Sequence, residues 1–325
     1  MRATQAFFEQ TGGPEVIQWR EVLLPAPGPG EVLLRHEAVG LNFIDTYFRT
    51  GLYPAALPAG LGMEAAGVVE AVGDGVTEVK VGDRAAYSGN PGAYSSARVL
   101  PAAALFGLPA GIDSRTAAAA LLKGATTEFL AERCAPLGPG EWALVPAAAG
   151  GVGLLLVQWL TARGVRVIGT VGSAAKVARA TEAGAEYVLL SDDAELAAKI
   201  REATGGKGVA VSYDGVGAAM WETSLKAMAP RGTLVSFGNA SGAITGVNLG
   251  ILASHGSLFV TRPTMYDYYR DPAERAAGAA KLWAMIESGK VKVTVGQTYP
   301  LHEAAQAHRD LEARKTTGST LLLPP

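Results

Sequence analysis

The sequence has 325 residues, and 49% of them are hydrophobic. This length exceeds that of most domains with a single hydrophobic core and suits two domains. Its formal net charge of −2 excludes the positive field that attracts nucleic acids or acidic lipids. A single cysteine, Cys134, excludes an intrachain disulfide and indicates a cytoplasmic protein.

The N-terminal residues do not resemble a secretory signal, because they lack an apolar run and include Glu9. Residues 142–160 carry no charge and come close to the roughly 20 apolar residues that cross a bilayer. However, Pro146 and the glycines that follow it would interrupt a spanning helix near its start. We therefore expect a strand, a glycine turn and a helix here, and no membrane segment.

Up to about residue 120, short apolar runs alternate with glycine and proline turns. Residues 32–34, 67–69 and 84–87 are the expected strands, and Pro25–Pro29, Gly73–Gly75 and Gly82-Asp83 are the turn signals between them. This pattern predicts an antiparallel β domain.

From about residue 122, apolar strands alternate with helical stretches such as residues 194–203. The expected strands are residues 142–145, 165–169, 187–190, 210–213, 233–237 and 258–260. This alternation predicts βαβ units, and six strands make a full Rossmann dinucleotide-binding fold, a doubly wound parallel sheet with helices on both faces.

Residues 261–325 do not continue the α/β series. They predict helices at 272–288 and 302–314 and a strand at 319–323, and we expect this tail to fold back onto the first domain. The predicted division is therefore one domain of residues 1–122 with 261–325, and a second domain of residues 123–260.

A glycine turn, Ala147-Ala-Ala-Gly150-Gly151-Val152-Gly153, lies between an expected strand and an expected helix. Glycines allow a backbone to approach a pyrophosphate closely, and the helix N-terminus supplies free N–H groups and a positive dipole end. The spacing is A-x-x-G-x-x-G rather than G-x-G-x-x-G, so a purely structural turn is the other interpretation. The βαβ context favours a dinucleotide site.

The end of the next strand indicates which dinucleotide binds. Sites for NAD usually place a carboxylate here for the ribose 2′-hydroxyl, and this sequence has none from Ile168 to Lys176. Ser173 and Lys176 could instead hold a 2′-phosphate, which favours NADPH. They could also be a helix cap and a solvated lysine, and both interpretations can hold together.

The sequence lacks the ligands of a zinc site. It has one cysteine, and its four histidines, His36, His255, His302 and His308, show no metal-ligand spacing. No tyrosine is followed four residues later by lysine, and no G-x-S-x-G elbow is present. We therefore expect no metal, and neither short-chain dehydrogenase nor serine hydrolase chemistry.

Several motifs together resemble one known family. They include Gly40-Leu-Asn42-Phe-Ile-Asp45-Thr-Tyr47, Gly51-Leu-Tyr53-Pro, Gly62-Met63-Glu64, Leu122-Lys123-Gly124, the Ala147–Gly153 turn, Ser236-Phe-Gly-Asn239 and Val260-Thr-Arg262-Pro. The chain is similar to the zinc-independent, zeta-crystallin-type NADPH:quinone oxidoreductases of the medium-chain dehydrogenase/reductase superfamily. The likeness covers nearly the whole chain, and Met63 stands where zinc-using relatives carry a histidine ligand.

The resemblance implies a GroES-like β domain completed by the C-terminal tail, with a cleft between it and the Rossmann domain. It places Asn42 by the nicotinamide, Thr126 by its ribose and Gly150, Gly151 and Val152 by the pyrophosphate. Further cofactor contacts would come from Gly172, Ser173 and Lys176 at the 2′-phosphate, Phe237, Gly238, Asn239, Val260, Thr261 and Arg262 beside the nicotinamide, and Arg314. One departure is Leu190-Ser191, where a related protein has Asn-Tyr, so stacking is lost there.

The implied reaction is hydride transfer from nicotinamide to a quinone in the cleft, without a metal. Tyr47 and Tyr53 could line the quinone pocket, with Tyr47 donating a hydrogen bond, or could be core aromatics. Lys123 could polarise an oxygen, stabilise its turn, or be a cation at the cleft edge. Two other functions stay open, an NADPH-dependent enone or alkenal reductase and a non-catalytic, crystallin-like NADPH-binding protein. The expected edge strand 258–260 suggests a homodimer.

Overall fold

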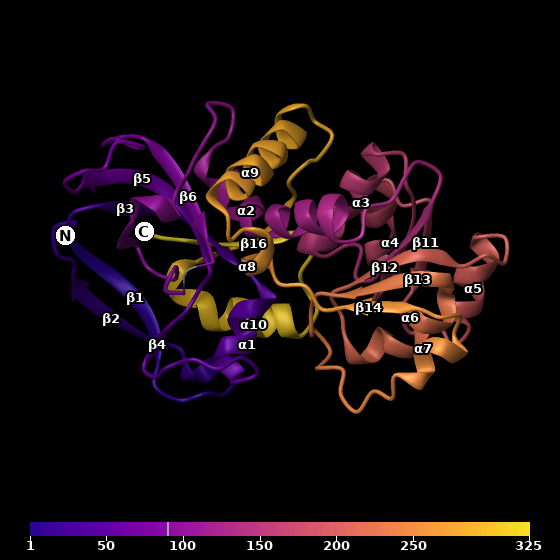
Figure 1. The fold of residues 1–325 in the computed structure, drawn as a ribbon. Coiled ribbons are helices and arrows are strands. Elements are labelled where there is room, and N and C mark those ends of the chain that lie inside the picture. The colour runs from indigo at the N-terminus through magenta and orange to yellow at the C-terminus, as the bar shows by residue number, and fades with distance from the viewer. Residues whose placement is uncertain (90) are drawn as a thin grey trace. The chain divides into compact units, whose positions relative to one another are not determined.

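The computed structural model describes residues 1–89 and 91–325, and this part of the chain forms two compact units (Figure 1). The first unit joins Met1–Lys123 to Val293–Pro325, and the second unit is Gly124–Lys292. The first unit is therefore built from two segments that are distant in sequence.

The first unit is rich in β structure, as its short apolar runs predict. A three-stranded sheet has the order β2-β1-β4 (β1, Arg2–Phe8; β2, Gln18–Leu23; β4, Ala59–Gly60). A seven-stranded sheet has the order β15-β16-β3-β5-β6-β8, with β7 paired to β3. Its strands are β3 (Glu31–Leu41), β5 (Glu64–Val72), β6 (Arg84–Ser88), β7 (Ala97–Pro101), β8 (Phe106–Gly107), β15 (Val295–Pro300) and β16 (Ser319–Leu323).

The C-terminal tail completes this second sheet. Strand β16 pairs antiparallel with β3, with Leu321 opposite Gly40, so the yellow end of the chain in Figure 1 lies beside an N-terminal strand. Leu301 and Leu322 from the tail are buried in one core with Phe8 and Leu34. The expectation that the end of the chain folds back onto the first domain is confirmed for residues 293–325.

The second unit contains a six-stranded parallel sheet in the order β11-β10-β9-β12-β13-β14. The strands are β9 (Trp142–Val145), β10 (Arg166–Val171), β11 (Tyr187–Leu190), β12 (Val209–Asp214), β13 (Met228–Ser236) and β14 (Phe259–Thr261). This is the 3-2-1-4-5-6 order of a Rossmann fold, so the predicted fold class is confirmed. The predicted bounds of β9 and β11 are the observed ones, whereas β13 begins earlier than expected.

The helices of the first unit are α1 (Phe43–Thr50) and α10 (Ala304–Glu312), and α2 (Ser114–Phe129) crosses the boundary between the units. A π-helical turn, Leu130–Cys134, follows α2. The second unit holds α3 (Gly151–Ala162), α4 (Val177–Glu182), α5 (Leu196–Ala203), α6 (Trp221–Ala227), α7 (Gly250–Ser254), α8 (Met265–Tyr268) and α9 (Pro272–Glu287). The predicted helix 302–314 is shorter, and Arg314 lies beyond it with φ of 58°.

The predicted domain boundary at residue 261 needs correction, because residues 261–292 pack with the second unit. Tyr268 stacks on Phe129 with ring centroids 4.6 Å apart, and its carbonyl accepts a hydrogen bond from Arg133. The Tyr269 hydroxyl donates to Glu128 at 2.9 Å. Aromatic and charged side chains therefore bind this stretch to the end of α2, a pairing that strand counting does not reveal.

Residues 142–160 form β9, a turn and most of α3, as predicted. Within residues 1–89 and 91–325, no helix is both long enough and apolar enough to span a bilayer.

Candidate active site

The glycine turn joins β9 to α3 in the second unit. Ala147 adopts φ of 53°, and its carbonyl oxygen accepts a hydrogen bond from Gly150 N at 2.9 Å. A Cβ atom on Gly153 would lie 2.3 Å from that same oxygen, so only glycine lets α3 begin this close to the turn. The N–H groups at the start of a helix lack partners within the helix, and Gly150, Gly151 and Val152 are partly exposed there. The turn can therefore cradle an anion such as a pyrophosphate.

A second candidate contact region follows β10. Gly172 and Ser173 are exposed, and Lys176 is half-buried one turn later. A Cβ on Gly172 would lie 4.0 Å from the Ser191 hydroxyl, so Ser191, at the end of β11, lies in the same corner. Residues 172–176 contain a hydroxyl and an ammonium group but no carboxylate. This donor set suits a phosphate better than a ribose 2′-hydroxyl.

The other half of the sheet ends in the Phe237–Asn239 and 260–262 segments. Arg262 reaches back from the end of β14 and donates to the carbonyl oxygens of Ser236 at 2.8 Å and Gly238 at 3.0 Å. The Asn239 amide, oriented to complement its neighbours, accepts from Arg262 at 2.9 Å and donates to Gly238 at 3.1 Å. These bonds hold the two loops together.

All of these segments lie at one edge of the sheet, because its six strands run parallel and each segment either follows a strand or, as in 260–262, forms the carboxyl end of one. The glycine turn follows β9, the strand at which the strand order reverses, with β10 and β11 on one side and β12 to β14 on the other. Parallel α/β sheets bind ligands at this position. The second unit thus carries, at one edge of its sheet, the residues predicted to contact the cofactor at the carboxyl ends of β9, β10, β13 and β14.

Asn42 lies in the first unit at the N-terminus of α1 and is 7% exposed. Its side-chain amide donates to Glu64 Oε2 at 2.9 Å, and its backbone N–H donates to Asp45 Oδ2 at 2.9 Å. Lys123 Nζ lies 3.2 Å from the same Glu64 oxygen, and the Glu64 side chain is fully buried. Asn42 is therefore fixed through both its backbone and its side chain.

An aromatic cluster follows Asn42 along α1. The rings of Tyr47 and Tyr53 meet edge to face with centroids 5.2 Å apart, and Tyr53 N donates to the Tyr47 carbonyl at 3.0 Å. Phe43 packs on Tyr47, and Phe48 packs on Tyr53. Tyr47 is 8% exposed and Tyr53 is half-buried, so Tyr53 is the more open ring.

The remaining predicted residues occupy different parts of the chain. Lys123 is buried in α2, and Thr126 lies in the same helix and is half-buried. Arg314 is exposed just after α10 in the first unit.

The sequence analysis did not single out Asp45 and Glu64, two buried carboxylates that hold Asn42. Burial raises the pKa of Asp45 to about 7, although hydrogen bonds from Asn42 and Tyr94 and the charge of Lys123 oppose this shift. Both residues belong to motifs of the family resemblance, Asn42-Phe-Ile-Asp45 and Gly62-Met63-Glu64. A carboxylate in an apolar context is the sequence feature that could have identified them as buried residues.

The donor set around Glu64 does not suit zinc. The position at which zinc-using relatives carry histidine is Met63, which is 1% exposed. Among the residues that the structure describes, no group of three His, Cys, Asp or Glu side chains could hold a metal ion. Lys123 supplies a positive charge beside the Glu64 carboxylate.

Two family models match the chain. The alcohol dehydrogenase GroES-like domain matches residues 28–110, and the zinc-binding dehydrogenase model matches residues 151–277. A quinone oxidoreductase from Pseudomonas aeruginosa is 53% identical over 98% of both chains, and a 2-haloacrylate reductase from a Burkholderia species is 39% identical over 98% of both. The crystal structure of the Escherichia coli quinone oxidoreductase complexed with NADPH is similar, with a TM-score of 0.96 and 47% identity, covering 99% of this chain and 100% of that one.

The similarity to these proteins extends over both units, and each family model matches a unit of the corresponding fold. The GroES-like match falls on the β-rich first unit, and the dehydrogenase match falls within the Rossmann unit. Since a quinone oxidoreductase relative is 53% identical over 98% of the chain and both family models match, the chain belongs to the zinc-independent quinone oxidoreductases of the medium-chain dehydrogenase/reductase superfamily.

Proposed function

We propose that this chain is an enzyme that reduces quinones with NADPH and without a metal ion. The observation that carries the proposal is the full-length identity to a quinone oxidoreductase, joined to a sheet edge suited to a phosphorylated dinucleotide. The carboxylate-free corner at Ser173 and Lys176 supports NADPH over NADH.

NADPH, when bound, supplies the hydride, and the chain's own residues hold and orient it. We assign the pyrophosphate to Gly150, Gly151 and Val152, where Gly151 and Val152 offer N–H groups at the start of α3 and the Gly150 N–H closes the turn onto Ala147. Gly172, Ser173 and Lys176 would bind the 2′-phosphate. The nicotinamide half is assigned to Phe237, Gly238, Asn239, Val260, Thr261 and Arg262, with Thr126 and Arg314 as further contacts.

A quinone needs no metal, because its ring becomes aromatic on reduction. We propose that Asn42 orients the reacting groups and that Tyr47 and Tyr53 line the quinone site, with the Tyr53 ring the more accessible. Lys123 is buried against Glu64, so we assign it the role of supporting Asn42 through that carboxylate.

The first test follows the loss of nicotinamide absorbance with 1,4-benzoquinone, with 9,10-phenanthrenequinone and with a simple enal, all in the presence of EDTA. We expect turnover of both quinones at the same rate with and without the chelator. NADPH binding with no turnover of any acceptor would exclude the proposed substrate class.

A second candidate is an enone or alkenal reductase, which the likeness to 2-haloacrylate reductase favours. Such an enzyme places hydride on the β-carbon of a conjugated carbonyl and needs an acid for the α-carbon. Turnover of the enal alone in the same assay would assign the chain to this class.

The role of Asn42 has its own test. We expect Asn42→Ala to lower kcat/KM for quinone by about 10- to 100-fold, because misplaced reactants lose the benefit of orientation. Asn248→Ala is the control, because Asn248 is exposed on the second unit and should leave kcat/KM unchanged. Equal kcat/KM values for the two variants would remove Asn42 from the site.

We further propose a cytoplasmic homodimer formed through β14. This strand is an edge of the parallel sheet, and Phe259 and Val260 are 61% and 40% exposed on it. Pairing two such edges across a two-fold axis would satisfy their backbone groups and cover these side chains. We expect sedimentation to show a dimer at micromolar concentration and Phe259→Lys to show a monomer. A monomeric wild type would exclude the dimer.

A further inference from the structure

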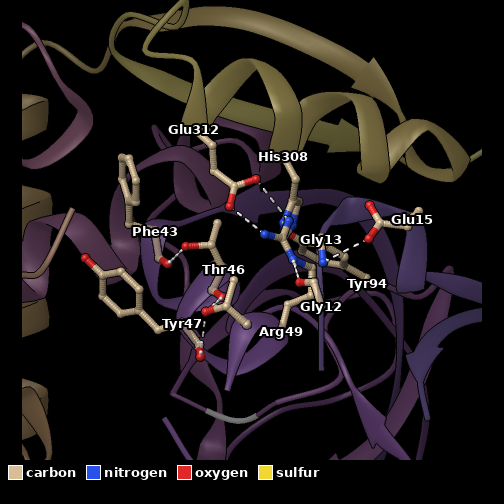
Figure 2. A network of polar contacts seen from close by, with 11 residues as sticks. Gly12, Gly13, Glu15, Phe43, Thr46, Tyr47, Arg49, Tyr94, His308 and Glu312 are labelled. Carbon is tan, nitrogen blue, oxygen red and sulfur yellow. Dashed lines mark hydrogen bonds and ion pairs between the residues drawn. The ribbon is translucent and has the colours of Figure 1, made fainter. Parts of the chain in front are cut away.

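Four buried polar side chains connect α10 to the start of α1 within the first unit. Arg49 and Asp45 lie on α1 and are each 1% exposed, His308 lies on α10 and is 0% exposed, and Tyr94, in the loop before β7, is 0% exposed. Figure 2 shows Arg49, His308 and Tyr94 side by side, with Glu312 above them. The proposed chemistry assigns no role to these four residues, which we call the buried donor chain.

The hydrogen bonds of this chain run in one direction. Arginine has no acceptor, so Arg49 Nη1 donates to His308 Nδ1 over 3.0 Å (Figure 2). A neutral ring that accepts at Nδ1 carries its proton on Nε2, which lies 2.9 Å from the Tyr94 hydroxyl oxygen. Tyr94 then donates its own proton to Asp45 Oδ2 at 2.9 Å. Each of these side chains therefore has one assignment of donor and acceptor atoms that satisfies the hydrogen bonds of its neighbours.

The electrostatics agree with this direction. Burial, together with the charge of Arg49, lowers the pKa of His308 to about 3, so the ring is neutral at physiological pH. Burial and the neighbouring Asp45 carboxylate raise the pKa of Tyr94 well above its usual value, so its hydroxyl keeps the proton that it donates.

The chain ends on the residue that holds Asn42. Asp45 Oδ2 accepts both the Tyr94 hydroxyl and the Asn42 backbone N–H, whereas Asp45 Oδ1 has no hydrogen-bond partner within residues 1–89 and 91–325. The direction of the Asp45 carboxylate therefore depends on Tyr94. If the Tyr94 hydroxyl is lost, the Asn42 backbone N–H is the one side of Oδ2 that is still hydrogen-bonded in this network, so the Asp45 carboxylate is less firmly oriented and holds the start of α1 less firmly.

We propose that Arg49, His308, Tyr94 and Asp45 are positioning residues, which transmit the placement of α10 to Asn42. The inference rests on the proposed function in one respect, that Asn42 orients the reacting groups. It predicts that side chains with no contact to substrate control turnover through a chain of hydrogen bonds.

The test compares two buried tyrosines of the same unit. Tyr87 is also 0% exposed, and its hydroxyl lies 3.3 Å from Nε2 of another buried histidine, His36, but it lies outside the buried donor chain. We expect Tyr94→Phe to lower kcat for quinone about tenfold while the KM for quinone changes less than about twofold. Tyr87→Phe should leave both constants at the wild-type level. Equal kcat values for the two variants would overturn the proposal.

A pair of variants at His308 tests the direction of the chain. Glutamine can accept from Arg49 through its oxygen and donate to Tyr94 through its nitrogen, whereas leucine can do neither. His308→Gln should therefore retain most of the wild-type kcat, and His308→Leu should lose about as much as Tyr94→Phe. If glutamine fails to rescue, the directional chain is wrong.

Hydrogen–deuterium exchange of the peptide that spans residues 40–50 separates this inference from the proposed function. Tyr94→Phe should raise the exchange rate at Asn42 and the first turn of α1 about tenfold, and Tyr87→Phe should not. Unchanged exchange in Tyr94→Phe overturns the inference even if quinones are reduced. A wild type that reduces no quinone refutes the proposed function, while the exchange experiment still decides whether the chain holds Asn42.

Discussion

Arg49→Met is expected to lower the free energy of unfolding by about 3–5 kcal/mol, the largest loss of stability that we predict for one substitution. The Arg49 guanidinium is 1% exposed and donates to Gly12 O at 3.1 Å, to His308 and to both carboxylate oxygens of Glu312 (Figure 2). Methionine fills a similar volume but leaves the Gly12 carbonyl, the His308 ring and the Glu312 carboxylate without their donor. Urea unfolding, followed by far-ultraviolet circular dichroism, measures the loss.

Arg35→Met is the matched control, because Arg35 also pairs with carboxylates in the first unit but at the surface. Its side chain is 41% exposed and bonds Glu70 at 2.6 Å. Exposed ion pairs contribute about 0–1 kcal/mol, so this variant should unfold almost as the wild type does. If the two variants lose equal stability, the buried Arg49 contacts contribute no more than a surface pair.

Gly153→Ala is expected to weaken NADPH binding by at least about tenfold, which corresponds to about 1.4 kcal/mol. The added Cβ would lie 2.3 Å from the Ala147 carbonyl oxygen and 2.9 Å from Ala148 Cα, and both are backbone atoms that cannot rotate away. The start of α3 must therefore move from the turn, and its N–H groups move with it. Titration of the protein with NADPH, followed by nicotinamide fluorescence, gives the Kd.

Gly138→Ala provides the control within the same unit. A Cβ on Gly138 would meet only the Glu141 carboxylate, at 3.4 Å, and that side chain can shift. We expect its Kd to match the wild type. A wild-type Kd for Gly153→Ala, in a variant that is otherwise folded, would mean that the turn does not bind the pyrophosphate.

The Rossmann unit was largely predictable from the sequence because its signals are local. Residues 142–145 and 187–190 form strands at the predicted bounds, since each is a short apolar run between polar or glycine residues. The glycine turn was predictable for the same reason, because its spacing, its preceding strand and its following helix are contiguous.

The contacts around Asn42 were not predictable in this way. Arg49 and Glu312 are 263 residues apart, and Tyr94 and His308 are 214 residues apart, so no periodic pattern links them. Each residue alone fits a surface position equally well, and α10 joins the first unit only in the folded chain, through the β16–β3 pairing and through Ala304 and Ala307 in the core. The contact of Lys123 with Glu64 was not predictable either, because the sequence could not distinguish a buried partner of Glu64 from an exposed cation.

The insertion of β16 between β15 and β3 has a consequence for synthesis on the ribosome. The second unit is continuous in sequence, so it can fold once residue 292 has left the exit tunnel. The first unit cannot close its larger sheet until residues 319–323 have been translated, although β3 was made nearly 300 residues earlier. The Val39–Leu41 end of β3 must therefore stay unpaired while the Rossmann unit forms, and during this interval that edge is open to chaperones and to aggregation.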